Sequence, residues 1–184
     1  NRHVMPALNQ ALRVPLDRGV IWRVLLDTYQ PETDRYGGVA GLPLAEELFC
    51  IDSVLALKLL AEYSGDQEGR WRGALAAVHT LLSAFLPSLR DRFAAISSMR
   101  RSSDLRFRAT SIMRRQLGEQ FRRSRRAIEE TLENDAGGLS STARSALREF
   151  ATSIGHIVSD LRAFENQGRL LQDSTKLVCS IAHM

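Results

Sequence analysis

The sequence predicts an α+β fold in which one strand is followed by about five or six helices. Hydrophobic residues make up 44% of the 184 residues and charged residues 25%, a balance typical of a globular protein. The stretch from Val20 to Tyr29 is rich in β-branched and aromatic residues, which favour a strand. From Leu44 onward, apolar residues recur at three- and four-residue steps, which indicates helices.

The N-terminal part, residues 1–43, is expected to hold the strand and a polar loop. A short helix is predicted over His3 to Leu12, and Pro15 should lie beyond its end. The strand is apolar on both of its faces, which predicts burial within a sheet. Because a single strand cannot stabilise itself, most of its sheet is expected upstream of Asn1. Residues 1–184 would then form a single domain or a fragment of one.

The helical part, residues 44–184, is expected to follow turns at Gly37-Gly38 and Gly41-Leu42-Pro43. Its helices should begin at capping residues and stop near glycine. The predicted starts are Leu44, Asp52-Ser53, Glu68, Ser103-Asp104, Ser140-Ser141 and Asp173, and the helix from Ser103-Asp104 should reach Glu133 or Asn134. Pro87 is expected to kink or break the helix that contains it.

The basic residues are nearly all arginine, and they cluster between residues 100 and 126, where ten arginines stand with two acids. On a helix, Arg108, Arg115 and Arg122 would fall close to one stripe. This stripe has two interpretations. It could bind an anionic partner, such as RNA or an acidic peptide, or it could be a solvated face that pairs with acids on neighbouring helices. Few aromatic residues interleave with the arginines, which argues against a surface for base stacking.

Several classes of protein and site are not expected. No stretch approaches the roughly eighteen consecutive apolar residues of a membrane span, and no secretory signal is visible, so a cytoplasmic location is predicted. The four histidines are far apart in sequence, and neither Cys50 nor Cys179 has a neighbouring thiol. A metal site and a disulfide are therefore not expected. Glycine-rich phosphate-binding motifs are also missing, and no cofactor is predicted.

Three segments resemble those of one protein family. They are the run from Leu26 to Gly38, which ends Glu-Thr-Asp-Arg-Tyr-Gly-Gly, the run from Leu44 to Ser53, which contains Ala-Glu and Asp-Ser, and the run from Ser180 to Met184, which contains His-Met. Together they resemble the C-terminal elimination domain of lantibiotic dehydratases and of related thiopeptide-type bacteriocin biosynthesis proteins. The segments occur in the family's order. Domains of this family also have a β-rich half upstream and an Asn-Arg pair after the closing His-Met segment. Neither has a counterpart in this chain. Residues 71–169 match the family only in helical character.

The resemblance implies chemistry on a ribosomally made precursor peptide. In that family, a separate domain or partner protein uses glutamyl-tRNA to glutamylate Ser and Thr side chains. The elimination domain then expels glutamate and leaves dehydroalanine or dehydrobutyrine. By this resemblance, Arg35 would clamp the glutamyl group or the developing enolate, Glu32 would orient Arg35, and His183 would transfer the proton. An arginine fork suits carboxylates, and an imidazole titrates near neutral pH. The resemblance implies neither a metal nor an organic cofactor.

Other functions stay open at this point. Related proteins of the same fold join two dehydroalanines into the pyridine ring of thiopeptides, so a cycloaddition enzyme is one alternative. A non-catalytic subunit that binds a leader peptide is another. In the family, the upstream half carries an arginine-containing strand that nothing before Tyr29 matches, which would favour this alternative if the 184 residues were the whole protein. A basic helical RNA-binding module rests on the arginine stripe alone. The sequence does not determine the oligomeric state, and a homodimer is one alternative.

Overall fold

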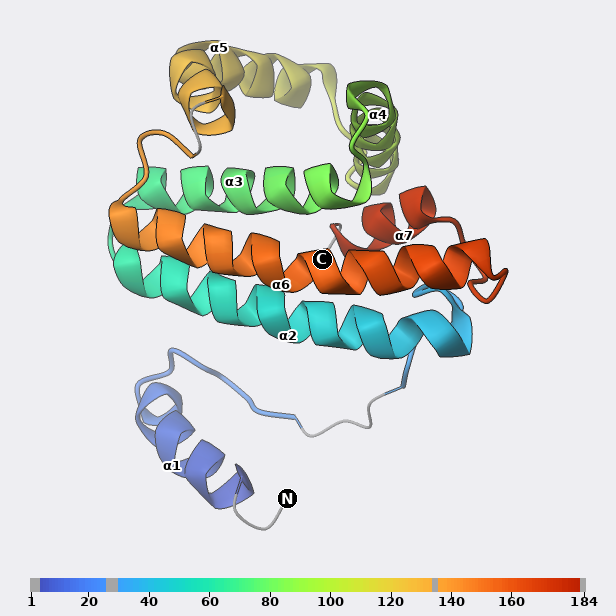
Figure 1. Ribbon diagram of the computed structural model, residues 1–184. Coiled ribbons are helices and arrows are strands. Elements are labelled where there is room, and N and C mark those ends of the chain that lie inside the picture. Colours follow the sequence, from blue (N-terminus) through green and yellow to red (C-terminus); the bar gives the residue numbers. More distant parts are fainter. Residues whose placement is uncertain (1–3, 26–29, 134–135, 183–184) are drawn as a thin grey trace. The chain divides into compact units, whose positions relative to one another are not determined.

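The computed structural model describes residues 4–25, 30–133 and 136–182, and it divides the chain into two compact units, Asn1–Pro31 and Glu32–Met184. The described residues form seven helices and no strand (Figure 1). The prediction of a mainly helical chain is therefore confirmed. The α+β class and the single strand are not confirmed.

The first unit contains helix α1, Val4–Asp17, which is longer than predicted. Pro15 lies inside the helix, where its ring removes one helical hydrogen bond without ending the helix. Residues 20–25, the described part of the predicted strand, form no strand, and residues 26–29 lie outside the described residues. Trp22 is 84% exposed rather than buried. A strand needs a neighbour to pair its N–H and C=O groups, and the described residues offer none.

The second unit is built on three long helices that lie side by side: α2 (Gly38–Glu62), α3 (Gln67–Phe85) and α6 (Ser141–Asn166) (Figure 1). The α2–α6 contact is the most extensive. The short helix α7, Ser174–Ile181, closes one end of the core. The largest fully buried side chains come from α2, α6 and α7; they are Leu48, Ile154, Leu161, Leu177 and Val178.

Helix α2 is continuous where the sequence predicted a turn and a second start. Gly41 and Pro43 lie within its first two turns, where a proline removes a single hydrogen bond. The Asp52-Ser53 pair lies in the helix interior and caps nothing. Instead, the Ser53 hydroxyl donates a hydrogen bond to the carbonyl of Phe49, 2.8 Å away, one turn earlier. The predicted turn at Gly41-Leu42-Pro43 and the predicted helix start at Asp52-Ser53 were therefore wrong. These residue types also occur inside helices where tertiary packing favours a continuous helix.

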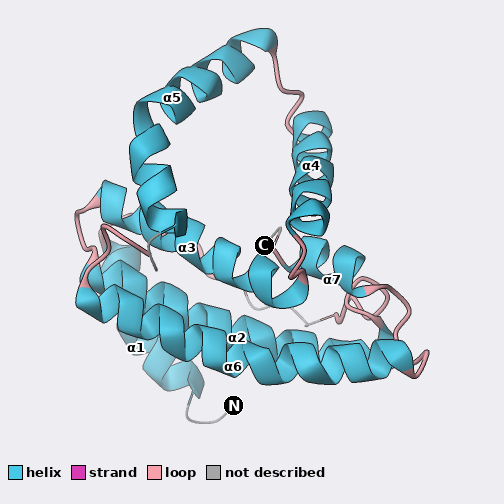
Figure 2. Ribbon diagram, turned by 45° about the horizontal axis from the view of Figure 1, so that its top comes forward, coloured by secondary structure: helices cyan, strands magenta, loops and turns pink. Residues whose placement is uncertain are grey.

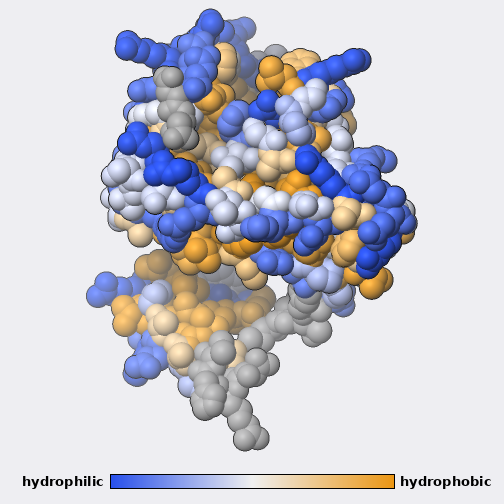
Figure 3. Space-filling model, viewed as in Figure 1, coloured by the Kyte–Doolittle hydropathy of each residue, from blue (hydrophilic) through white to orange (hydrophobic). Residues whose placement is uncertain are grey.

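Helix α2 is apolar around most of its circumference, and part of its apolar surface faces outward. Val54, Leu57 and Leu60 are all more than half exposed. Figure 3 shows apolar residues along the edge of the second unit where α2 runs. No helix in the described ranges combines the length and the low polarity needed to cross a bilayer.

Helices α4 (Leu89–Arg106) and α5 (Ser111–Glu133) extend from the core at the side of α3 (Figure 2). The break predicted at Pro87 is confirmed, since α3 ends at Phe85. The start predicted at Ser103-Asp104 was wrong, because this pair lies inside α4. The chain breaks later, where Arg108 adopts the left-handed conformation with φ 47°. Thr110 then caps α5, its hydroxyl accepting the N–H of Met113 at 3.2 Å.

The last two predicted helix starts are confirmed. The Ser140 hydroxyl accepts the backbone N–H of Ala143 at 3.1 Å and caps α6. The Asp173 carboxylate accepts the N–H of Lys176 at 2.8 Å and caps α7. Each cap satisfies a backbone donor that the first turn of a helix leaves without a partner.

Candidate functional site

The loop before α2 carries Glu32 and Arg35, two of the residues singled out from the sequence. It is a tight turn, in which the N–H of Arg35 donates to the carbonyl of Glu32 at 3.0 Å and the N–H of Gly38 to that of Thr33 at 2.8 Å. Within it, the Arg35 guanidinium donates to the Glu32 carboxylate at 2.8 Å. The two side chains are 40% and 56% exposed. Glu32 therefore orients Arg35 while leaving much of its guanidinium accessible.

Glycine is required at the end of this loop. Gly38 has a φ of 82°, and a Cβ there would lie 2.8 Å from the Leu171 side chain. At Gly41, a Cβ would lie 2.5 Å from the backbone carbonyl oxygen of Tyr36. Left-handed backbone and close approach both favour the one residue without a Cβ. The Tyr-Gly-Gly segment is thus the part of the motif that lets the chain turn sharply into α2.

The loop is also held by side chains and by a distant segment. Tyr36 is buried, and its ring packs edge-on against Phe49 with the centroids 5.1 Å apart. The guanidinium of Arg35 lies 5.5 Å from the Tyr36 ring centroid, a cation–π distance. From the connection between α6 and α7, the Gln172 side-chain amide donates to the Asp34 carbonyl at 2.7 Å. These contacts hold the loop against α2 and against the connection that precedes α7.

Arg35 lines a pocket of about 200 Å³ together with residues from two helices, which we call the Arg35 pocket. The other lining residues are Ser98, Met99 and Ser102 of α4 and Cys179 and Ser180 of α7. The polar groups are one guanidinium, three hydroxyls and a thiol, with no carboxylate among the described lining. A fixed cation among hydroxyl donors suits a carboxylate ligand.

His183 lies outside the described residues. Ser180, three positions earlier in the sequence, lines the Arg35 pocket. The end of α7 also borders a smaller pocket of about 120 Å³, where Ile181 and Ala182 line the same space as Asp52 of α2. Desolvation raises the pKa of the Asp52 carboxyl above its usual value. All three sequence segments of the motif therefore reach the surroundings of α7.

Cys179 does not have the character of a nucleophile. Partial burial, and after it the negative charge of Asp173, raises the pKa of the Cys179 thiol. The thiol is therefore protonated at neutral pH, whereas the thiolate is the reactive form. In the Arg35 pocket, Cys179 acts as a weakly polar wall.

The cap of α7 leads to a prediction about pH. The backbone N–H of Lys176, and less so its ammonium group, lowers the pKa of Asp173 below its usual value. A lowered carboxylate pKa stabilises the fold above the unfolded-state pKa of about 4, and this stability is lost as pH falls through the folded-state value. Asp173→Ala is expected to lower the free energy of unfolding by about 1 kcal/mol at neutral pH.

Urea unfolding at a series of pH values measures this difference, which should shrink as the pH is lowered below about 4. Asp160→Ala provides the control, because Asp160 is exposed on α6 and caps no helix. Equal stability of the Asp173→Ala and Asp160→Ala proteins at neutral pH would contradict the assigned cap.

The arginine cluster is distributed differently from the predicted stripe. Arg108 lies in the break between α4 and α5, so it does not share a helical face with Arg115 and Arg122. Arg115 and Arg122 are exposed on α5 and form no ion pair with a described residue. Within the cluster, Arg114 pairs with Asp104 at 3.6 Å, and Arg125 pairs with Glu129 at 2.7 Å. Arg115 and Arg122 are therefore not neutralised by acids among the described residues, and whether they bind a partner stays a prediction.

Ser98, Ser102 and Ser180 also line the Arg35 pocket, although the sequence did not predict them as neighbours of Arg35. Ser98 and Ser102 are one turn apart on α4, which puts both hydroxyls on one face, but nothing local in the sequence indicates that Arg35 faces them. In the part of the chain that the structure describes, no group of three or more potential metal ligands comes together.

Comparison with known proteins gives one match. A family model described as the C-terminal part of the lantibiotic biosynthesis dehydratase matches residues 1–184, the whole chain. No curated protein and no solved structure matches.

Proposed function

Because the chain belongs to the family of lantibiotic biosynthesis dehydratase C-terminal domains, its role lies in lantibiotic biosynthesis, and we propose that it removes glutamate from a glutamylated precursor peptide. The substrate would be a ribosomally made peptide whose Ser or Thr side chains carry glutamate in ester linkage. The products would be free glutamate and a dehydroalanine or dehydrobutyrine residue. The observation that supports this most is the Arg35 pocket, with its oriented guanidinium and three hydroxyls.

Elimination makes two demands that the site residues can meet. A base must take the α-proton, and the electrons of that C–H bond form the new Cα–Cβ double bond as the Cβ–O bond breaks. Glutamate then leaves with the electron pair of the Cβ–O bond, as a carboxylate. Arg35 would bind this carboxylate or the enolate oxygen that develops before it leaves, and a fixed cation stabilises such charge strongly.

The remaining residues would position these groups. Glu32 holds the Arg35 guanidinium by its 2.8 Å hydrogen bond and so limits the directions in which it can point. Ser98 and Ser102 would donate hydrogen bonds to the glutamyl group from the opposite wall. We assign the proton transfer to His183, since imidazole can exchange a proton near neutral pH. This assignment rests on the resemblance of the C-terminal motif and on the position of Ser180 in the pocket lining.

Elimination is favoured over the alternatives. A cycloaddition enzyme would have to hold two dehydroalanines, which carry no carboxylate in their side chains, so the exposed guanidinium would have no evident ligand there. A subunit that only binds a leader peptide would not need an arginine held by a partner carboxylate inside a pocket. Glutamylation itself, and the glutamyl-tRNA that it consumes, would belong to a separate domain or partner protein.

The proposal is tested with a precursor peptide that has been glutamylated beforehand. Incubation with the protein should release free glutamate and convert the glutamylated residues to dehydroalanine or dehydrobutyrine, as seen by mass spectrometry. The His183→Ala protein should leave the glutamylated peptide intact. Normal elimination by this variant would remove His183 from the mechanism, and a failure of the unmodified protein to release glutamate would refute the proposed function.

A further inference from the structure

One side of α4 leaves large apolar side chains in solvent. Leu89, Phe93 and Ile96 follow one another at steps of four and three residues, so they form a single stripe along the helix. Their exposed fractions are 76%, 74% and 51%. Ala95, the buried residue of α4, lies off this stripe, because residues one or two positions apart do not share a helical face. The stripe therefore contributes little to the packing of the second unit.

Arginines extend and border the stripe. Arg100 lies four positions after Ile96 and continues it toward the end of the helix, and Arg90 and Arg101 lie along one side of it. All three arginines are exposed, and they form no ion pair with a described residue. We call the three apolar and the three basic residues the α4 face. It combines an apolar surface with positive charge.

The α4 face lies next to the Arg35 pocket. Ser98, Met99 and Ser102 of the same helix line that pocket. Met99 is three positions after Ile96, so their side chains are neighbours on the helix surface. Helix α4 packs against α7, which supplies the opposite wall of the pocket. A peptide whose glutamyl group occupies the Arg35 pocket therefore needs to cross only Met99 to reach the α4 face.

The chemistry of the α4 face distinguishes between classes of partner. A second copy of this chain would bring a second set of arginines to the interface, and like charges repel. A single-stranded nucleic acid would pair its phosphates with the arginines, but its bases stack on aromatic rings, and two of the three apolar side chains are aliphatic. A peptide segment that carries both apolar side chains and carboxylates complements both parts of the face.

We propose that the α4 face binds a segment of the precursor peptide that combines apolar side chains with carboxylates and lies outside the residue to be dehydrated. The apolar side chains would cover Phe93 and its two neighbours in the stripe, and the carboxylates would pair with Arg100 and Arg101. The identity of the partner rests on the proposed function. The α4 face would determine the affinity for the peptide through residues other than those that line the Arg35 pocket.

Synthetic peptides that each contain one glutamylated serine test this proposal. One peptide carries the segment Leu-Leu-Glu-Glu beside the serine, the second carries Gly-Ser-Gly-Ser at the same place, and the third carries Leu-Leu-Lys-Lys. Each segment is placed before the serine in one set of peptides and after it in another. Fluorescence anisotropy measures the Kd of versions in which an amide replaces the glutamyl ester, and glutamate release from the ester versions is measured separately. Binding and elimination can therefore fail independently.

The Leu-Leu-Glu-Glu peptide is expected to bind the unmodified protein at least about tenfold more tightly than the other two peptides, in one of the two placements. Phe93→Ser and Arg100→Gln should each weaken its binding by about fivefold or more, because an apolar anchor or a charge-assisted hydrogen bond is lost. Leu57→Ser and Arg70→Gln are the matched controls, since both residues are exposed on other helices. Their affinities should stay within about twofold of the unmodified protein.

Equal affinities of the three peptides in both placements would overturn the proposal, and so would equal weakening by the control variants. Tighter binding of an oligouridylate than of the Leu-Leu-Glu-Glu peptide would also overturn it and would assign the α4 face to nucleic acid. Circular dichroism of each variant shows whether it is folded. If the expected binding is observed but no glutamate is released, the proposed elimination fails and the α4 face remains a peptide-binding surface.

Discussion

Replacing Arg35 with lysine is expected to slow glutamate elimination by about 100-fold or more, the effect of losing one fixed donor to a developing anion. Lysine keeps the charge but presents a single ammonium group in place of a planar fork. It would also lose the geometry of the 2.8 Å contact with Glu32 and the cation–π contact with Tyr36. The Arg35→Lys variant therefore tests whether elimination needs the oriented guanidinium group or only a positive charge at this position.

The measurement is the rate of glutamate release from a glutamylated peptide under single-turnover conditions. Arg123→Lys is the matched control, because Arg123 is exposed on α5 and forms no ion pair with a described residue. Glu32→Gln should have a smaller effect, on the order of tenfold, since the amide still accepts a hydrogen bond but carries no charge. If Arg35→Lys released glutamate within about threefold of the unmodified rate, Arg35 would not be the group that stabilises the transition state.

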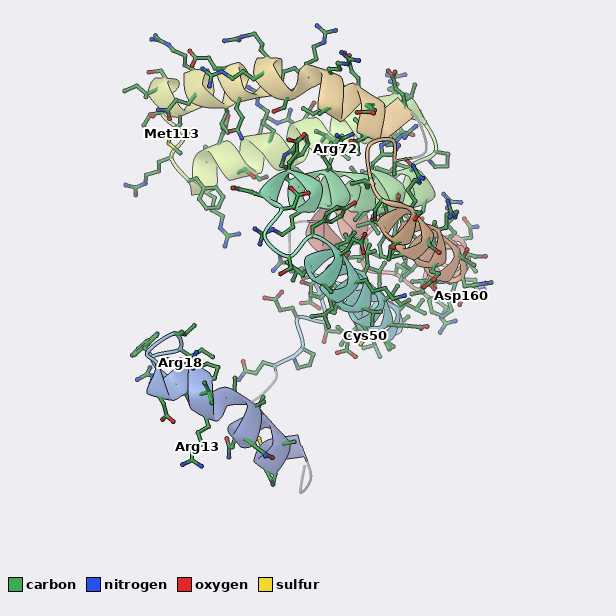
Figure 4. All side chains as sticks on the ribbon, turned by 90° about the vertical axis from the view of Figure 1, so that its left-hand side faces the viewer. Arg13, Arg18, Cys50, Arg72, Met113 and Asp160 are labelled. Atoms are coloured by element: carbon green, nitrogen blue, oxygen red, sulfur yellow. The ribbon has the colours of Figure 1, made fainter. Side chains whose placement is uncertain are left out.

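Replacing Arg72 with methionine is expected to lower the free energy of unfolding by about 3 kcal/mol. Arg72 is the buried arginine that joins α3 to α5 and to the following turn (Figure 4). Its Nε donates to the Thr131 hydroxyl at 2.9 Å, and its Nη2 donates to the Gly137 carbonyl at 2.7 Å and pairs with Glu130 at 2.9 Å. Methionine fills similar space but leaves the buried Gly137 carbonyl without this donor.

Urea unfolding compares this variant with Arg70→Met, which removes an exposed arginine two positions away on α3. The control should change stability by less than about 0.5 kcal/mol. A second variant, Gly138→Ala, tests the geometry, because a Cβ at Gly138 would overlap the Arg72 guanidinium. Its cost should be smaller when Arg72 is already methionine. Equal stability of the Arg72→Met and Arg70→Met proteins would contradict the structural role of this network.

The sequence predicted those helix boundaries that local chemistry decides. Ser140 and Asp173 cap α6 and α7 as expected, because each side chain accepts an N–H from its own first turn. Ser53 has the same chemistry but bonds back to Phe49 inside α2. Nothing within a few residues of the sequence distinguishes these two uses of a serine hydroxyl. The packing of α2 along α6 determines that Ser53 lies inside a helix instead of capping one. This packing cannot be inferred from the neighbouring residues in the sequence.

In the candidate site, too, some features follow from neighbouring residues in the sequence and others depend on tertiary packing. Glu32 and Arg35 are three positions apart, so their pairing follows from the turn that carries them. Ser98 and Ser102 reach the Arg35 pocket only because α4 packs against α7, a contact between segments far apart in the sequence. The predicted strand depends in the same way on partners that the described residues do not contain.

Locating the glutamyl group on the protein tests directly whether the Arg35 pocket is the elimination site. A precursor peptide in which an amide replaces the glutamyl ester resists elimination and should stay bound, and a photoreactive group on the glutamyl side chain would mark the residues around it. Mass spectrometry of the cross-linked protein should find the label on residues 98–102 or 179–180, which line the Arg35 pocket. A label confined to other segments, such as the exposed arginine face of α5, would contradict the assignment of this pocket as the elimination site.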